Sequence, residues 1–231
     1  MLVKKHHAEA PRSGVTLSQT TTMATELPGL PQHFKLPETL GLIVLEDCFH
    51  FPGCFLPLYI FEQRYRQMLE DALAGSRMIG VGTMVDGELL PVTTLGLIRA
   101  SKKGLDGTSH VMLYGVTRVR FTGWVQEKPY RIATIEPFST LMDSSKDSLE
   151  ALRDRALQLL PPVSPECGEA MQKLRTMLSE MECPDMVCDI LSYHFVRDPA
   201  AAARLLTEPS LEQRYKILFK QLDQLRADVE G

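Results

Sequence analysis

The hydrophobic pattern of the chain changes its period near residue 140, and this change restricts the fold more than any other feature. Between about residues 40 and 138, short apolar runs are separated by glycine-containing turns, as in 40-LGLIVL-45, 78-MIGVGTM-84 and 130-YRIATIEPF-138. After about residue 144, apolar residues recur at helical spacing instead. A set of strands followed by a set of helices predicts an α+β fold rather than an alternating α/β one.

The first half is predicted to form a small β-barrel or sandwich that one helix interrupts. The pair Asp106-Gly107 separates the strand-like runs 94–101 and 109–115, and this is a hairpin signal because glycine accepts a positive φ. The interrupting helix spans about residues 61–74, where apolar side chains form a stripe. Gly75 occupies the position of a left-handed C-cap.

The second half is predicted to form a bundle of four or five helices. Serine or aspartate precedes several of them as an N-cap, and Ser210 with Gln213 forms a capping box for the last. The expected helices span about residues 146–160, 164–181 and 184–196, with a short helix after Asp198-Pro199 and a last helix from Ser210. Residues 1–32 are polar and aperiodic, which predicts a disordered tail. The expected subdomains are therefore a barrel over residues 33–140 and a bundle over residues 141–231.

Charge and cysteine content exclude several functional classes. Residues 33–138 contain 11 basic and 11 acidic residues, and residues 139–231 contain 11 basic and 16 acidic residues. This balance argues against a nucleic-acid-binding surface. The five cysteines form no CxxC pair, as expected for reduced thiols in a cytoplasmic protein. No apolar run reaches 18 residues, so no membrane partner is expected.

The sequence shows no standard catalytic motif. Phosphate-binding GxxxxGK[ST] and GxGxxG loops, GxSxG nucleophile elbows and HExxH zinc motifs are all absent from it. We therefore expect no catalytic residue, no resident metal and no cofactor. One enzymatic alternative stays open, namely a zinc- or thiol-dependent site built on Cys48, His50 and Cys54, although their spacing is not a common zinc pattern.

The ribbon 51-FPGCFLPLYIFEQRY-65 is an apolar segment that two prolines interrupt directly before the predicted helix. Pro52 and Pro57 each lack a backbone donor, so the ribbon cannot be a central strand. Its apolar side chains are expected to fix the helix against the barrel, and some of them could instead line a groove for apolar peptide segments.

The ribbon and the segments after it resemble the N-terminal domain of Lon proteases. The stretch 51-FPGCFLPLYIFEQRYRQML-69 resembles the "PL-x-IFE-x-RY" helix entry of that family, and 95–124 resembles its "G-x-x-A" strand, "DG" hairpin and "G-x-x-R" strand. Matches at 129–138, 185–195 and 204–222 extend the resemblance over roughly residues 34–225. The resemblance implies a PUA-like β pseudo-barrel with one inserted helix, followed by a C-terminal helical bundle.

The resemblance also implies a function, which is binding of polypeptide substrates. The ATPase and serine-lysine protease modules of full Lon proteases have no counterpart in this sequence. We therefore expect a stand-alone, non-catalytic module whose partner is an unfolded or a specific protein client, or a larger protease that it serves as an adaptor. A PUA-like RNA-binding module is the alternative. The residues predicted to contact peptide are Phe51, Phe55, Leu56, Tyr59, Phe61, Glu62, Arg64, Tyr65, Arg118 and Arg120.

Overall fold

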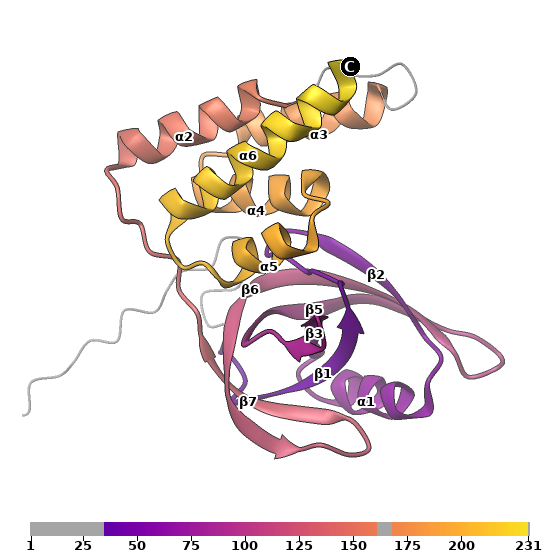
Figure 1. The fold of residues 1–231 in the computed structure, drawn as a ribbon. Helices are drawn as coiled ribbons and strands as arrows, with labels where there is room; N and C mark the ends of the chain where they lie inside the picture. The colour runs from indigo at the N-terminus through magenta and orange to yellow at the C-terminus, as the bar shows by residue number, and fades with distance from the viewer. Residues whose placement is uncertain (1–34, 161–167, 231) are drawn as a thin grey trace, which may run out of the picture. The chain divides into compact units, whose positions relative to one another are not determined.

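The computed structural model of the protein describes residues 35–160 and 168–230. Strands and one helix occupy the first part of this region, and helices occupy the second (Figure 1). The strands are β1 (Thr39–Glu46), β2 (Phe55–Ile60), β3 (Met78–Val85), β4 (Glu88–Leu89), β5 (Val92–Lys103), β6 (Ser109–Gln126) and β7 (Arg131–Pro137). The helices are α1 (Gln63–Ala74), α2 (Lys146–Gln158), α3 (Gly168–Glu180), α4 (Pro184–Phe195), α5 (Pro199–Thr207) and α6 (Leu211–Glu230). The predicted α+β class is confirmed.

Five of the strands close into a barrel. Neighbours in the order β1, β7, β6, β5, β3 are antiparallel, and β3 returns to β1 as a parallel pair. Closure satisfies the strand edges within the ring. β2 lies outside the ring and pairs only with the first half of β6 among the described strands. This agrees with the inference that a ribbon with two prolines cannot be a central strand.

The glycine-containing turns follow the sequence signals, with one exception. Asp86 and Gly87 have φ values of 50° and 81°, which suits the tight β3–β4 hairpin, and Gly107 has a φ of 80° in the β5–β6 hairpin. Gly75, however, is not left-handed, because its φ is −117°. The positive φ occurs instead at Arg77, two residues after Gly75. The Arg77 N–H donates a hydrogen bond to the Ala72 carbonyl at 2.8 Å, which closes the end of α1.

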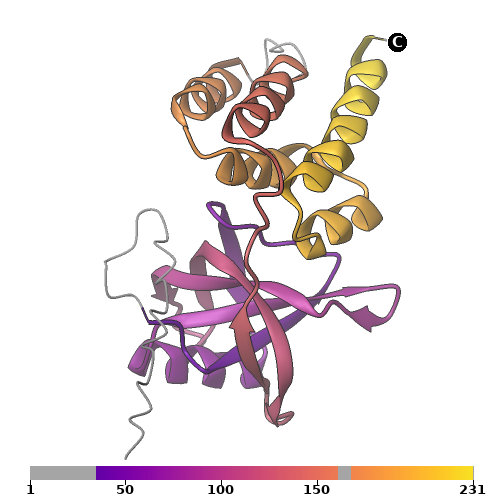
Figure 2. The ribbon, with the colours of Figure 1, turned by 90° about the vertical axis from the view of Figure 1, so that its left-hand side faces the viewer.

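Two hydrophobic cores hold the described residues together, and the proline-containing ribbon contributes to both. Its first part places Phe51 and Cys54 in the core of the helical bundle. Its second part places Ile60 in the barrel core under α1. The two parts are joined at Gly53, which has a φ of 76°. The ribbon therefore connects the bundle to the barrel, and Figure 2 shows the bundle helices α2–α6 above the strands and α1 below them.

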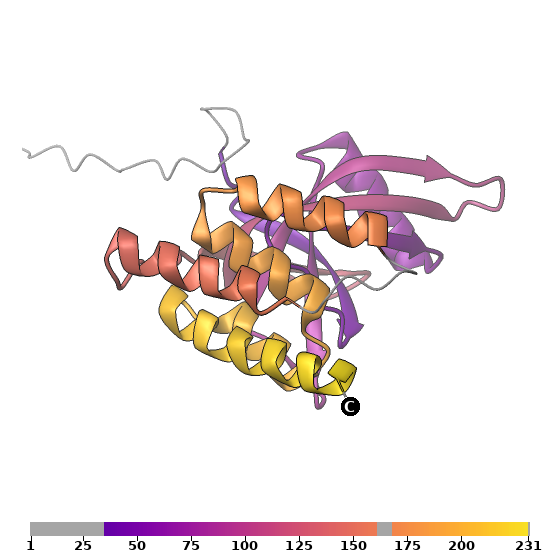
Figure 3. The same ribbon diagram turned by 90° about the horizontal axis from the view of Figure 1, so that it is seen from above.

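The last helix packs against the other bundle helices along a row of apolar side chains at helical spacing. Leu211, Tyr215, Leu218 and Leu222 have no exposed surface, and α6 contacts α2, α4 and α5 (Figure 3). Ser210 accepts a hydrogen bond from the Gln213 N–H at 3.1 Å, as its N-cap role predicts. The reciprocal acceptor is Glu208, which binds the Ser210 N–H at 2.9 Å. The predicted tail 1–32 and the start of the helix predicted over residues 164–181 lie outside the described residues. No helix in the described ranges combines the length and apolarity needed to span a bilayer.

The N-cap of α5 is expected to contribute to the stability of the fold. The Asp198 carboxylate accepts a hydrogen bond from the Ala201 N–H at 3.1 Å. Asp198→Ala is expected to lower the free energy of unfolding by about 1 kcal/mol, because that N–H loses its acceptor at the first turn. Urea unfolding measures this change. Asp223→Ala, which removes an exposed aspartate in the middle of α6, serves as the control and should change stability much less. Equal losses in the two variants would contradict the capping role.

Candidate binding face

Strand β2 divides its side chains between two very different surroundings. Phe55 and Tyr59 are each 52% exposed, and Pro57 between them is also exposed. Leu56, Leu58 and Ile60 point the opposite way and pack into the barrel core. An antiparallel sheet with one buried face normally presents polar side chains on its other face. The outer face of β2 is instead aromatic.

The partner strand β6 continues this surface. The register pairs Phe55 with Tyr114, Pro57 with Met112, and Tyr59 with His110. Directly opposed residues of an antiparallel pair share one face of the sheet. These six residues therefore form one continuous surface, which we call the β2–β6 face.

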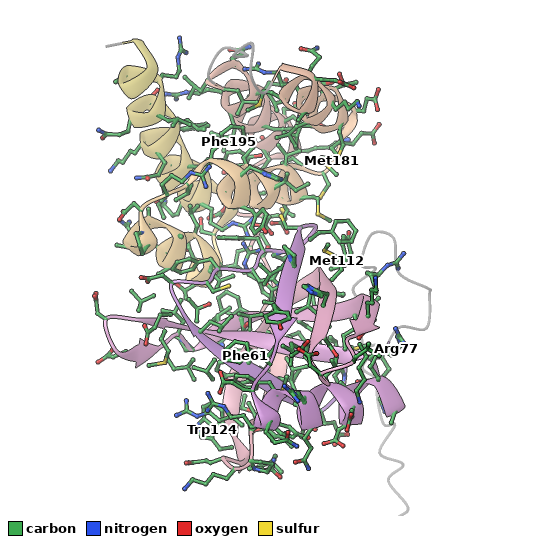
Figure 4. All side chains as sticks on the ribbon, turned by 90° about the vertical axis from the view of Figure 1, so that its right-hand side faces the viewer. Phe61, Arg77, Met112, Trp124, Met181 and Phe195 are labelled. Carbon is green, nitrogen blue, oxygen red and sulfur yellow. The ribbon has the colours of Figure 1, made fainter. Side chains whose placement is uncertain are left out.

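The rings of the β2–β6 face are stacked on one another across the strands. The ring centres of Phe55 and Tyr114 lie 5.1 Å apart, and those of Tyr59 and His110 lie 4.9 Å apart. Phe61, which is 58% exposed, extends the row, with its ring centre 6.0 Å from that of Tyr59. These separations are typical of favourable aromatic pairs. The face is therefore a pre-ordered aromatic platform, on the barrel side of the molecule where Figure 4 labels Met112 and Phe61.

The support beneath the platform is fully packed. Leu113 and Val111 of β6 alternate with the exposed residues and are buried in the barrel core, which also contains Met68 and Leu69 of α1. A surface that is held from behind in this way loses little conformational entropy when a ligand binds to its front.

A small apolar notch adjoins the platform where β1 and β2 face each other without pairing. Its volume is about 60 Å³, and its walls include Leu45, Leu58 and Phe61. Tyr65 closes the inner end, because its hydroxyl contacts both the N–H and the carbonyl of Val44, at 3.1 and 3.4 Å. The notch has room for a small aliphatic group at most.

The edge of β2 is poorly suited to adding a further strand. The Gly115 N–H donates to the Cys54 carbonyl at 2.9 Å, and hydrogen bonds alternate along an antiparallel pair. By this alternation, the backbone groups of Phe55, Pro57 and Tyr59 point away from β6. Pro57 has no N–H, and the Phe55 carbonyl already accepts a hydrogen bond from the Tyr193 hydroxyl of α4 at 2.9 Å. Burial raises the pKa of Tyr193, which keeps this hydroxyl a donor.

The predicted peptide contacts divide into exposed and buried residues. Phe55, Tyr59 and Phe61 are exposed, and Leu56 is half-buried against the barrel core. Phe51 is 1% exposed and lies in the bundle core, where core residues cover it, so the prediction that it contacts peptide is contradicted. Tyr65 is 6% exposed, belongs to the barrel core and reaches a ligand only through the inner end of the notch.

The four charged residues that were predicted to contact peptide, Glu62, Arg64, Arg118 and Arg120, belong to three separate ion pairs. Arg64 donates to Glu62 at 2.7 Å, at the exposed start of α1, and Arg120 lies 3.5 Å from Glu136 of β7. Arg118 is only 3% exposed and binds Asp189 of α4 at 2.8 Å. The prediction that Arg118 contacts peptide is contradicted in this structure, because the helical bundle covers this part of β6.

Cys48, His50 and Cys54 do not form a metal or nucleophile site. The His50 Nε2 donates to the Cys54 carbonyl at 3.1 Å rather than meeting a thiol, and burial raises the pKa of both thiols. Protonated, buried thiols are poor nucleophiles. Within residues 35–160 and 168–230, no three His, Cys, Asp or Glu side chains converge as metal ligands.

Sequence reasoning missed four residues of this region. His110, Met112 and Tyr114 alternate along 109-SHVMLYG-115, and the alternation of Phe55, Pro57 and Tyr59 matches theirs. A search of the sequence for two runs in which aromatic residues occupy alternate positions could have paired these two strands. Tyr193 carries no comparable signal, because its bond to the Phe55 carbonyl joins residues 138 positions apart.

Comparison with known families identifies the chain. A family model for the ATP-dependent protease La (LON) substrate-binding domain matches residues 39–224. The chain belongs to this family. The Lon protease of Desulfosudis oleivorans is 24% identical to this Lon substrate-binding domain over 200 residues, which cover 82% of the chain and 24% of that protease. Lon protease 2 of Myxococcus xanthus is 24% identical over 227 residues, covering 94% of the chain and 27% of that relative.

Solved structures show the same fold. The N-terminal domain of the Mycobacterium avium complex Lon protease superposes with a TM-score of 0.65 at 13% identity, over 80% of this chain and 97% of that one. The Lon N-terminal domain protein of Xanthomonas campestris superposes with a TM-score of 0.56 at 22% identity. The superposition covers 79% of this chain and 97% of that one. The predicted Lon N-terminal fold is confirmed. The chain spans about a quarter of the length of the curated relatives it matches.

Proposed function

We propose that this Lon substrate-binding domain binds extended polypeptide segments rich in apolar and aromatic side chains, with the β2–β6 face as the contact surface. The observation that carries the proposal is the exposed aromatic row on a sheet whose opposite face is buried. Exposed aromatic side chains on a rigid support are typical centres of protein-binding surfaces. Family membership supports a substrate-binding role.

Recognition would come from side-chain stacking rather than from strand addition. Pro57 and the Tyr193–Phe55 hydrogen bond leave the β2 edge few free backbone groups. An unfolded client would place aromatic and aliphatic side chains on Phe55, Tyr59 and Phe61, with a small side chain in the adjoining notch. The exposed Glu62–Arg64 pair at the rim would orient polar groups of the client.

The proposed role is binding without catalysis by the domain itself, in the cytoplasm. The partner would be an unfolded or a specific protein, and the domain would present it to a larger protease as an adaptor. The relatives that carry the name Lon protease are about four times longer than the matched region, so their proteolytic activity is not carried over to this chain.

Removal of two rings tests the face. Phe55→Ser with Tyr59→Ser is expected to weaken binding by about 30-fold or more, because truncating an anchor residue of an interface costs at least about 1 kcal/mol. Fluorescence anisotropy of the 231-residue chain with a labelled unfolded protein measures the affinity, and the native, folded form of that protein should bind much more weakly.

Leu105→Ser is the matched control for this experiment. Leu105 is fully exposed in the β5–β6 hairpin and lies outside the β2–β6 face. Its replacement removes surface apolarity without touching the platform, so affinity should stay within a factor of about two. Equal effects of the two variants, or unchanged affinity in the double variant, would exclude this face as the binding surface. Sedimentation velocity of both variants checks that the face does not instead join two copies of the chain.

A further inference from the structure

A second surface of the chain, in the helical bundle, has a different chemistry. A cleft of about 460 Å³ opens among α2, α5 and α6. Four basic side chains line it: Arg155 from α2, Arg204 from α5, and Lys216 and Lys220 from α6. Residues 139–231 contain 16 acidic and 11 basic residues, so about a third of the basic residues of an acidic region converge on one cleft.

The acidic side chains of this cleft neutralise only some of its basic side chains. Lys216 is paired with Glu212 at 2.6 Å, and Glu208, which also lines the cleft, already accepts the Ser210 N–H. Asp223 is the other acidic side chain in the wall. Within the described residues, Arg204 and Lys220 make no ion pair. The cleft therefore offers at least two cations that a ligand could neutralise.

The floor of the cleft is apolar and holds one of its cations in place. The Arg155 guanidinium lies 4.4 Å from the centre of the Phe219 ring, which is itself 6% exposed. Ile217 adds a second buried apolar side chain to the lining. A stacked arginine is pre-oriented for a planar carboxylate, which it can bind through two hydrogen bonds.

We propose that this cleft binds an acidic segment of a partner polypeptide, in which aspartate or glutamate side chains alternate with apolar ones. Carboxylates would pair with Arg204, Lys220 and Arg155, and an apolar side chain would rest on Phe219. The apolar floor and the two acidic residues in the wall favour a peptide over a polyphosphate or a nucleic acid, whose continuous negative charge they would repel. This site is separate from the β2–β6 face and does not depend on its function.

Charge reversal tests the cleft. The probe is a fluorescein-labelled decapeptide of alternating glutamate and leucine, measured by anisotropy with the 231-residue chain. Arg204→Glu with Lys220→Glu is expected to weaken its binding more than tenfold, because two attractive charges become repulsive. Binding should also weaken as the salt concentration rises. A peptide with glutamine in place of glutamate should bind at least tenfold more weakly than the acidic one.

The control variant has the same net charge as Arg204→Glu with Lys220→Glu. Lys146→Glu with Lys173→Glu changes the same total charge at exposed positions of α2 and α3 that do not line the cleft. It should alter affinity by less than about threefold. Equal losses in both double variants, no binding of the acidic peptide, or stronger binding of an RNA oligonucleotide of equal charge would each overturn the proposal. Phe55→Ser with Tyr59→Ser should leave the difference in affinity between the glutamate and glutamine peptides unchanged, which separates the two surfaces.

Discussion

Asp189→Asn is expected to lower the free energy of unfolding by about 3–5 kcal/mol, the loss typical of a buried ion pair that keeps only one charged partner. Asp189 is 2% exposed and binds the Arg118 guanidinium through both oxygens, one of them at 2.8 Å. Arg214, also buried, lies 3.6 Å from the same carboxylate and pairs with Asp185. Removal of one negative charge leaves two buried guanidinium groups facing one carboxylate.

The effect should depend on the charge rather than on the volume of the side chain. Arg118 also donates to the Leu206 carbonyl at 3.1 Å, so its position at the junction of barrel and bundle is fixed. In Arg118→Met with Asp189→Leu, both charges are absent, and stability should recover to well above that of Asp189→Asn. Urea unfolding of Arg118→Met, of Asp189→Leu and of the double variant gives the coupling energy.

An exposed ion pair supplies the control for this measurement. Glu62→Gln breaks the Glu62–Arg64 pair, whose side chains are 38% and 51% exposed. Solvent screens such a pair, so the loss should stay below about 1 kcal/mol. If Asp189→Asn costs no more than Glu62→Gln, the buried network does not hold the helices to the barrel.

The stability of the fold is expected to fall by about 3 kcal/mol between pH 7 and pH 4 because of His50 alone. His50 is 1% exposed, and burial lowers its pKa from 6.5 to about 4, with the bond to the Cys54 carbonyl opposing the shift only in part. Nε2 donates that bond, and Nδ1 is buried with no hydrogen-bond partner in the described part of the chain. A proton on Nδ1 would therefore carry a buried charge.

The sign of the pH effect follows from which state binds the proton first. Below pH 6.5 the unfolded chain protonates His50 while the folded chain does not, so folding loses stability until the pH reaches about 4. Above pH 6.5 the ring is neutral in both states and has no effect. His50→Gln removes this titration. Urea unfolding of both proteins at pH 7, 5.5 and 4 should show a shallower pH dependence in the variant, and parallel curves would contradict the assignment.

Much of the fold could be predicted from the sequence because its signals are local. The runs at 40–45 and 78–84 became β1 and β3, and Asp106-Gly107 became the hairpin between β5 and β6. Asp198 and Ser210 cap the helices they precede, since a cap needs only residues three positions away. The ribbon motif identified the family from its residue order alone.

The candidate face could be predicted only in part. Phe55, Tyr59 and Phe61 were predicted and are exposed, but Phe51 and Tyr65 have the same residue types and are buried. Residue type does not distinguish them, because the covering side chains come from distant segments. Arg118 and Arg120 likewise share a face of one strand, yet α4 covers the first and leaves the second in solvent.

The sequence by itself determined the order of the strand-rich and helical halves, the β5–β6 hairpin, the N-caps of α5 and α6 and the family of this chain. All of these rest on interactions between residues close in the chain or on a continuous motif. The tertiary structure alone decided which side of β2 is exposed, which arginines are buried, and which cations converge between α2, α5 and α6. The physical reason is that burial and ion pairing depend on contacts between residues far apart in sequence, such as Arg118 and Asp189, 71 positions apart.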